Sequence, residues 1–139
     1  VASVEGIKHI RKQEEKLYDI KVEMAYDDSA QGDPAMAKKW QTVMLHVDSP
    51  NASDWRQAII DADSILAELL TKMQYPGAGV GEQLMAATKA DFNTLDQAWE
   101  AHKVRNQIAH EGSDFKLSQH EAKRIIGLYK QVFEEFFYI

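Results

Sequence analysis

The sequence predicts an all-α fold, and three observations lead to this prediction. Apolar residues recur at spacings of three and four through nearly every segment, and no run alternates apolar and polar residues as a half-buried strand would. The three prolines and seven glycines gather in short breaks between the periodic segments. The 139 residues suit one domain with its own core. We therefore expect an up-and-down bundle of four main helices and one short helix, with an additional N-terminal helix.

The first predicted element is a charged amphipathic helix within residues 1–30. Its apolar positions recur at roughly helical spacing between residues 4 and 24, among many charged side chains. Such a helix either docks on the bundle or projects from it as a spacer. The helical domain itself is expected to span residues 34–139. Because the sequence begins with Val1 rather than Met, we expect it to be a piece of a longer protein.

The first two helices of the domain are separated by the break DSPNASD. Pro34 is suited to opening the first of them, since its missing N–H would have no intrahelical partner there. That helix is expected to run to about residue 47, with Trp40, Val43, Met44 and Val47 as its apolar stripe. Asn51 followed by Asp54 is a capping pattern that opens the next helix. That helix covers residues 55–73, with Trp55, Ile59, Ala62, Leu66 and Leu69 or Leu70 facing the core.

The remaining helices follow from their start and stop signals. The break YPGAGVG over residues 75–81 precedes a short helix over residues 82–89. Asn93 with Asp96 predicts the start of a helix over residues 94–110, which Gly112 ends. Ser118 with Glu121 is a capping box that opens the last helix, and its tail VFEEFFYI is expected to bury Phe133 and either Phe136 or Phe137.

Composition narrows the function classes. The apolar content of 45% and the charged content of 27% are typical of a soluble globular protein. The absence of cysteine excludes disulfides, thiolate zinc sites and thiol nucleophiles. The net charge of -6 argues against a general nucleic-acid coat, so we expect no DNA partner. We expect no metal and no organic cofactor.

The segment VRNQIAH, residues 104–110, is the strongest candidate site. In an ideal helix Arg105 and His110 lie about 140° apart, whereas His102, Asn106 and His110 share one stripe. Arg105 and His110 can therefore meet only if the helix end distorts near Gly112, or if two copies of the helix meet in a C₂ homodimer. The alternative is that Arg105 and His110 merely complement the negative end of the helix dipole.

Two copies of the motif would supply the chemistry of metal-independent RNA cleavage. Guanidinium groups bind phosphate oxygens through paired hydrogen bonds, and imidazoles transfer protons near neutral pH. In this hypothesis His110 is the base or acid, Arg105 stabilises charge on the phosphorane, and Asn106 positions the scissile group.

The pattern R-N-x-x-A-H near the end of a penultimate helix resembles the motif of HEPN domains. The match falls on Arg105, Asn106 and His110, with Ala109 at the usual small position. This resemblance implies a HEPN-like helical bundle and a homodimer formed through the motif helices. Many members of that family are metal-independent endoribonucleases, and others use the same fold for binding or scaffolding.

A narrower resemblance covers roughly residues 5–135. The elements DW, AD and AHKVRNxIAH look like those of a group of uncharacterised bacterial proteins, which typically carry an N-terminal membrane segment before a charged helix and this domain. The resemblance implies a membrane anchor in a missing N-terminal segment, with the domain in the cytoplasm or at the cytoplasmic face of a membrane. It implies no particular reaction.

Three further residues are candidate binding groups beside the motif. An inward-facing carboxylate is rarely left unpaired, so we expect Asp63 to pair with Arg105 or His102 and Asp61 to face solvent. Lys103 would make the surroundings of the motif locally positive. A metal site on the stripe of His102 is not favoured, because HExxH is absent and no carboxylate completes a ligand set.

The sequence leaves three function hypotheses open. The domain binds a nucleotide or another phosphorylated ligand without chemistry, or it is a protein-interaction module in which Arg105 serves the fold. The alternative is an endoribonuclease whose site combines Arg105 and His110 from two protomers. The two binding hypotheses together are favoured over the third.

Overall fold

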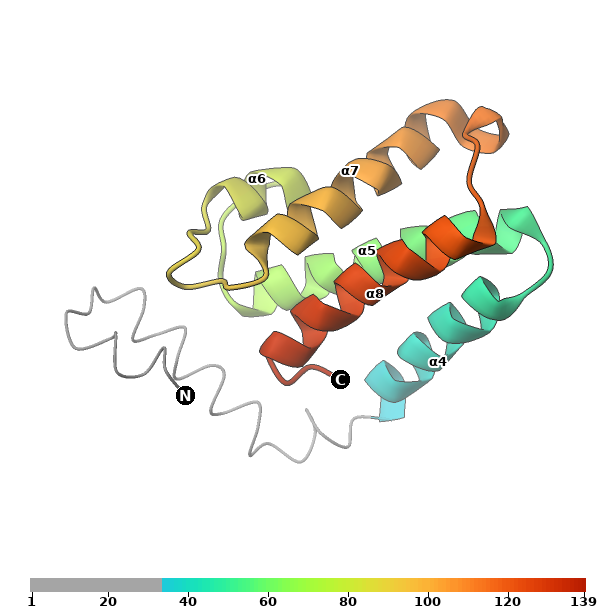
Figure 1. The fold of residues 1–139 in the computed structure, drawn as a ribbon. Helices are drawn as coiled ribbons and strands as arrows, with labels where there is room; N and C mark the ends of the chain where they lie inside the picture. Colours follow the sequence, from blue (N-terminus) through green and yellow to red (C-terminus); the bar gives the residue numbers. More distant parts are fainter. Residues whose placement is uncertain (1–33) are drawn as a thin grey trace.

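The computed structural model describes residues 34–139, and every regular element within them is helical (Figure 1). The charged helix expected within residues 1–30 lies outside the described residues. The elements are α4 (Pro34–Asp48), α5 (Ala52–Lys72), α6 (Val80–Met85), α7 (Leu95–Glu111), the 3₁₀ turn η2 (Gly112–Asp114) and α8 (Gln119–Glu135). The prediction of an all-α domain with four main helices and one short helix is therefore confirmed for this part of the chain.

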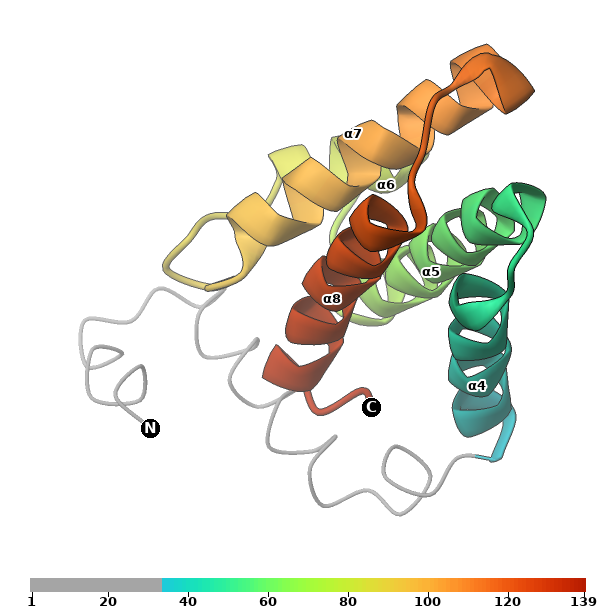
Figure 2. The ribbon, with the colours of Figure 1, turned by 45° about the vertical axis from the view of Figure 1, so that its right-hand side comes forward.

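The helix α5 organises the bundle, because it packs against α4, α6, α7 and α8. Helices α4 and α7 run in one direction and α5 and α8 return, so successive long helices alternate (Figure 1). Figure 2 shows α5 and α8 as a central pair, with α4 on one side and α7 on the other. Short connections between long amphipathic helices favour this arrangement.

The core lies between α5 and α8 and extends into the C-terminal tail. The side chain of Phe133 is fully buried and meets Trp40 of α4 edge-on, with 5.6 Å between ring centroids. Phe136 is also fully buried and meets Phe92 edge-on at 4.9 Å, whereas Phe137 is exposed. The tail therefore completes the core through Phe136, one of the two residues expected there.

The predicted apolar stripe of α4 is correct except at one position. Val43 and Val47 are buried, and Trp40 is partly buried against the core, but Met44 is 38% exposed. Met36 is buried instead. A helix position 100° further round than Val43 lies at the edge of the packed face, so spacing alone does not place it inside.

Several predicted helix boundaries are confirmed. The helix α4 begins at Pro34, and Ser118 caps α8 by accepting a hydrogen bond from the backbone N–H of Glu121 at 3.0 Å. Gly112 ends α7 with a φ of 59°, a left-handed conformation that glycine adopts without strain. Asn51 occupies the cap position of α5, although its side chain makes no capping hydrogen bond.

Other boundaries differ from the prediction by a few residues, and the start of α7 is set by a tertiary contact. The short helix α6 spans Val80–Met85, whereas the prediction placed it over residues 82–89, and the extended Gly79 is its N-cap. The helix α7 is not capped by Asn93. Its first turn is capped from α8, where the Glu135 carboxylate accepts the backbone N–H groups of Asn93 and Thr94, each at 2.8 Å. The Thr94 hydroxyl donates to the same carboxylate at 2.6 Å.

Candidate functional site

The centre of the candidate site is the carboxylate of Asp63, which is only 4% exposed in the middle of α5. Oδ1 lies 3.0 Å from Nδ1 of His102 on α7 and accepts a hydrogen bond from the hydroxyl of Tyr129 on α8 at 2.8 Å. Oδ2 lies 3.7 Å from Nε of Arg105, which makes an ion pair. Asp63 therefore contacts both of the basic groups considered for it, and one carboxylate joins three helices.

The surroundings of Asp63 fix the hydrogen-bonding roles of its partners. An ionised carboxylate can only accept hydrogen bonds, so Nδ1 of His102 is the donor in this contact. Burial raises the pKa of Tyr129 well above its usual value, and the charge of Asp63 and the hydrogen bond to it add to this rise. Tyr129 is therefore a fixed, neutral donor at physiological pH.

The guanidinium of Arg105 lies at the boundary between this buried network and solvent. Its side chain is 38% exposed, while Nε faces Asp63. Nη1 donates a hydrogen bond to the side-chain oxygen of Asn106 at 3.2 Å. The two contacts hold the guanidinium in place, while more than a third of the side chain stays open to an incoming group.

The structure does not bring His110 to Arg105 within one chain. The helix α7 continues through Glu111, beyond both residues, and His110 is exposed. The distortion of the helix end that would have joined them is therefore absent from the described part of the chain. Asn106 is also exposed, so the accessible members of the motif lie on the outer side of α7.

An open hollow lies along this outer side of α7. It has a volume of about 600 Å³ and is lined by Asp96, Trp99, Glu100 and Lys103. Trp99 is partly buried against the core, and its ring centroid lies 6.5 Å from that of His102. Lys103, the remaining predicted binding residue, therefore belongs to this hollow, whereas Asp63 and His102 belong to the buried network.

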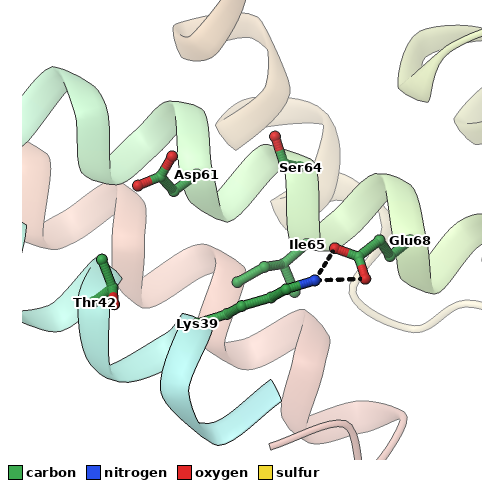
Figure 3. A pocket seen from close by; sticks show the side chains of 6 residues that line it. All are labelled: Lys39, Thr42, Asp61, Ser64, Ile65 and Glu68. Carbon is green, nitrogen blue, oxygen red and sulfur yellow. Dashed lines mark hydrogen bonds and ion pairs between the residues drawn. The ribbon is translucent and has the colours of Figure 1, made fainter. Parts of the chain in front are cut away.

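A second hollow, of about 330 Å³, lies where α4 crosses α5 (Figure 3). Lys39 bridges both carboxylate oxygens of Glu68 across it, at 2.9 and 3.0 Å. The hydroxyls of Thr42 and Ser64 donate back to their own helices, and Asp61 accepts from Gln57. Since each polar side chain in this hollow is engaged within the chain, we regard it as a helix crossing rather than a ligand site.

Tyr129 is the member of the network that the sequence analysis missed. It falls on the apolar stripe of α8 with Ala122, Ile125 and Val132, all of them buried, so it looks like ordinary core. The signal that identifies it is its hydroxyl, because a buried phenol usually has a hydrogen-bond partner. A buried Tyr and a buried Asp on facing helices are therefore candidates for a pair.

The described residues contain neither a cluster of metal ligands nor a helix that could span a membrane. Over residues 34–139, no three His, Asp or Glu side chains are gathered as a metal ion requires. Within the same residues, no helix combines the length and the apolar character needed to cross a membrane.

The chain was also compared with known proteins. No family model, no curated protein and no solved structure matches it.

Proposed function

We propose that this domain binds a phosphate ester, a nucleotide or another phosphorylated ligand, through Arg105. The observation that carries the proposal is the placement of its guanidinium. Asp63 and Asn106 hold two of its nitrogen atoms, at 3.7 and 3.2 Å, while the side chain remains 38% exposed. Guanidinium recognises phosphate through paired hydrogen bonds, and a donor that is already positioned loses little conformational entropy on binding.

We further propose that the bundle is HEPN-like and acts as a homodimer. The motif lies at the end of α7, which is the penultimate long helix, as the resemblance requires. Since Arg105 and His110 leave α7 in different directions, a site that uses both needs a second copy of the helix. The exposure of Asn106 and His110 leaves both available to such a partner.

The proposal is tested by titrating the protein with ribose 5-phosphate in a calorimeter. We expect wild type to bind and Arg105→Gln to bind about tenfold more weakly or worse, because a hydrogen-bonded charge is lost. Arg105→Lys keeps the positive charge but loses the paired hydrogen-bond donors of the guanidinium. Its affinity for ribose 5-phosphate should therefore lie between those of wild type and Arg105→Gln. Lys130→Gln removes one exposed positive charge from α8 and serves as the matched control. Equal binding by wild type and Arg105→Gln, with both shown folded by circular dichroism, refutes the proposal.

The ribonuclease alternative is separated by one further assay. Labelled single-stranded RNA is incubated with the protein in EDTA, comparing wild type with Arg105→Gln and His110→Ala. Binding without chemistry predicts intact RNA in all three reactions. Cleavage by wild type that is lost in both variants would instead assign proton transfer to His110 and charge stabilisation to Arg105.

The protein-interaction hypothesis predicts a different result for the Arg105→Gln variant. If Arg105 served the fold alone, Arg105→Gln would lower the melting temperature. Neither wild type nor the variant would then bind ribose 5-phosphate. The expected anchor and the location at the cytoplasmic face of a membrane stay predictions, because they concern residues outside 34–139.

A further inference from the structure

We infer that an acidic cluster at one end of the bundle is the docking site for a basic run of the same chain, residues 8–12. The cluster consists of Tyr75, Asp91 and Glu135, a phenol and two carboxylates. The basic run lies outside the described residues, whereas the cluster lies within them. Since the cluster lies at the start of α7, it is separate from the proposed ligand site at Arg105.

Aromatic packing gathers the three residues of the acidic cluster. The ring of Phe92 meets that of Tyr75 with 6.4 Å between centroids, and that of Phe136 with 4.9 Å. Asp91 directly precedes Phe92 in the chain, and Glu135 directly precedes Phe136. The carboxylate of Glu135 also accepts two backbone N–H groups at the start of α7. The end of α5, the loop before α7 and the end of α8 therefore meet at this place.

The acidic cluster combines negative charge with a buried phenol that makes no hydrogen bond. Asp91 is 4% exposed and Tyr75 is 6% exposed. The hydroxyl of Tyr75 makes no hydrogen bond to any described residue. Burial raises the pKa of Tyr75, and the charges of Asp91 and Glu135 raise it further. Because buried negative charge is costly unless a positive group accompanies it, the cluster favours a cation.

A Lys or Arg side chain suits the acidic cluster better than a metal ion does. An ammonium group has three N–H donors and a guanidinium has five, so either can donate to a phenol oxygen and to carboxylates together. Over the described residues, no three His, Asp or Glu side chains gather as a metal ion requires. The described lysines closest in sequence to the cluster make other contacts. Lys72 lies 5.9 Å from the ring centroid of Tyr138, and Lys89 pairs with Asp96 at 2.8 Å.

The N-terminal part of the chain carries a suitable run of cations and joins the bundle at the same end. Residues 8–12 contain no acidic side chain and three of Lys or Arg type, Lys8, Arg11 and Lys12, whereas acidic residues recur through residues 13–33. Helices α4 and α7 begin at one end of the bundle, and α8 finishes there (Figure 1 and Figure 2). The chain before Pro34 therefore enters beside the cluster. Even at the rise of an α-helix, residues 13–33 would cover about 30 Å, roughly the width of three packed helices.

Exposed apolar side chains next to the acidic cluster extend the docking surface. Phe137 is 46% exposed and Ile139 is 39% exposed, and both follow Glu135 within four residues. Phe137 has a φ of 57°, a left-handed conformation that is unfavourable for a bulky residue. Ile7 and Ile10 flank the basic run and match these apolar side chains in character. The surface therefore complements the run in both charge and polarity.

The docking is tested with a nitroxide label in NMR spectra of the full chain, which has no cysteine of its own. Ile139→Cys places the label next to the acidic cluster. Gln107→Cys places it on the exposed second half of α7 and is the control. We expect the first label to broaden the amide signals of residues 8–12 and the second to leave them sharp. Replacing Lys8, Arg11 and Lys12 together by Gln should abolish the broadening.

Two changes within the bundle test the charge of the cluster. Asp91→Asn removes one carboxylate charge and should greatly reduce the broadening by the label at residue 139. Glu134→Gln removes an exposed charge beside the cluster and should leave it unchanged. Asp91→Asn and the triple Gln variant should each lower the melting temperature by about 3–5 °C. Combined, they should lower it no further than the larger single effect, because both remove one contact.

Three results would overturn the inference. If neither label, or both labels equally, broadens residues 8–12, the run does not dock at this end of the bundle. If broadening persists in the triple Gln variant, the acidic cluster does not hold the run. Mixing nitroxide-labelled chains with separate isotope-labelled chains gives the third result, since broadening in that mixture alone means that the run docks on a second copy.

Discussion

Asp63 shows how a single buried carboxylate can organise the candidate site. A buried charge is costly unless its oxygens are satisfied, and here the donors come from His102, Tyr129 and Arg105. The same contacts that stabilise the carboxylate also position Arg105 at the surface. The contacts of Asp63 therefore contribute both to the stability of the fold and to the proposed ligand binding.

Asp63→Ala should lower the free energy of unfolding by about 3–5 kcal/mol, because it leaves buried polar partners without their acceptor. Asp61→Ala is the matched control two residues earlier on the same helix. The Asp61 side chain is 34% exposed and makes surface contacts, so its loss should cost less than about 1 kcal/mol. Urea denaturation measures both values. Similar losses in the two variants would mean that Asp63 is not the centre of a costly network.

Tyr129 gives the network a pH dependence at the alkaline end. The pKa of Tyr129 is raised in the folded state, chiefly by burial. The unfolded chain therefore releases the phenol proton at a lower pH than the folded protein does. Stability from Tyr129 is therefore full below pH 10 and falls as the pH rises from 10 toward the folded-state pKa. Tyr129→Phe should lower stability at pH 7, by about 1–3 kcal/mol, because Asp63 loses a donor.

The alkaline fall of Tyr129→Phe should nevertheless be shallower than that of wild type. Some fall remains, since burial also raises the pKa of Tyr75. Urea midpoints recorded between pH 8 and pH 12 for both proteins provide the comparison. Parallel curves for the two proteins would contradict the assigned role of the phenol.

At the scale of the helices, the start of α7 depends on a side chain from α8. Glu135 accepts the backbone N–H groups of Asn93 and Thr94, which would otherwise have no intrahelical partner. Its negative charge also lies at the positive end of the helix dipole. This contact fixes the end of α7 that carries Trp99 and the hollow.

Glu135→Ala should therefore destabilise the protein by about 1–3 kcal/mol, through the loss of charged hydrogen bonds. Its neighbour Glu134 is exposed, and Glu134→Ala should stay within about 0.5 kcal/mol of wild type. Hydrogen exchange gives the local test: protection should fall first at the start of α7 in Glu135→Ala. Unchanged protection there would mean that the helix start is held by other contacts.

At the scale of the whole molecule, the sequence predicts the elements well because apolar periodicity and end signals are local. Pro34, Ser118 and Gly112 mark helix ends correctly for this reason. The cap of α7 could not be predicted, since Glu135 lies 41 residues from Thr94 in the sequence. Tyr129 was missed for the same reason, being 66 residues from Asp63.

The candidate site was predictable in its residues and only partly in its geometry. Asp63 was expected to pair with Arg105 or His102, and it contacts both because α5 lies beside α7 in the bundle. The division between a buried network and an exposed face was not predictable. It depends on how α7 is rotated against its neighbours, and the packing of the whole bundle sets that rotation.

The shared carboxylate also has an evolutionary consequence. A substitution at Asp63, His102 or Tyr129 leaves a buried polar group without one of its hydrogen-bond partners. These three positions are therefore expected to change only together. Their persistence among relatives would follow from folding alone and would say nothing about a ligand. The buried network places no such requirement on Trp99, Lys103 and Asn106. Conservation at these three surface positions would therefore indicate selection for binding.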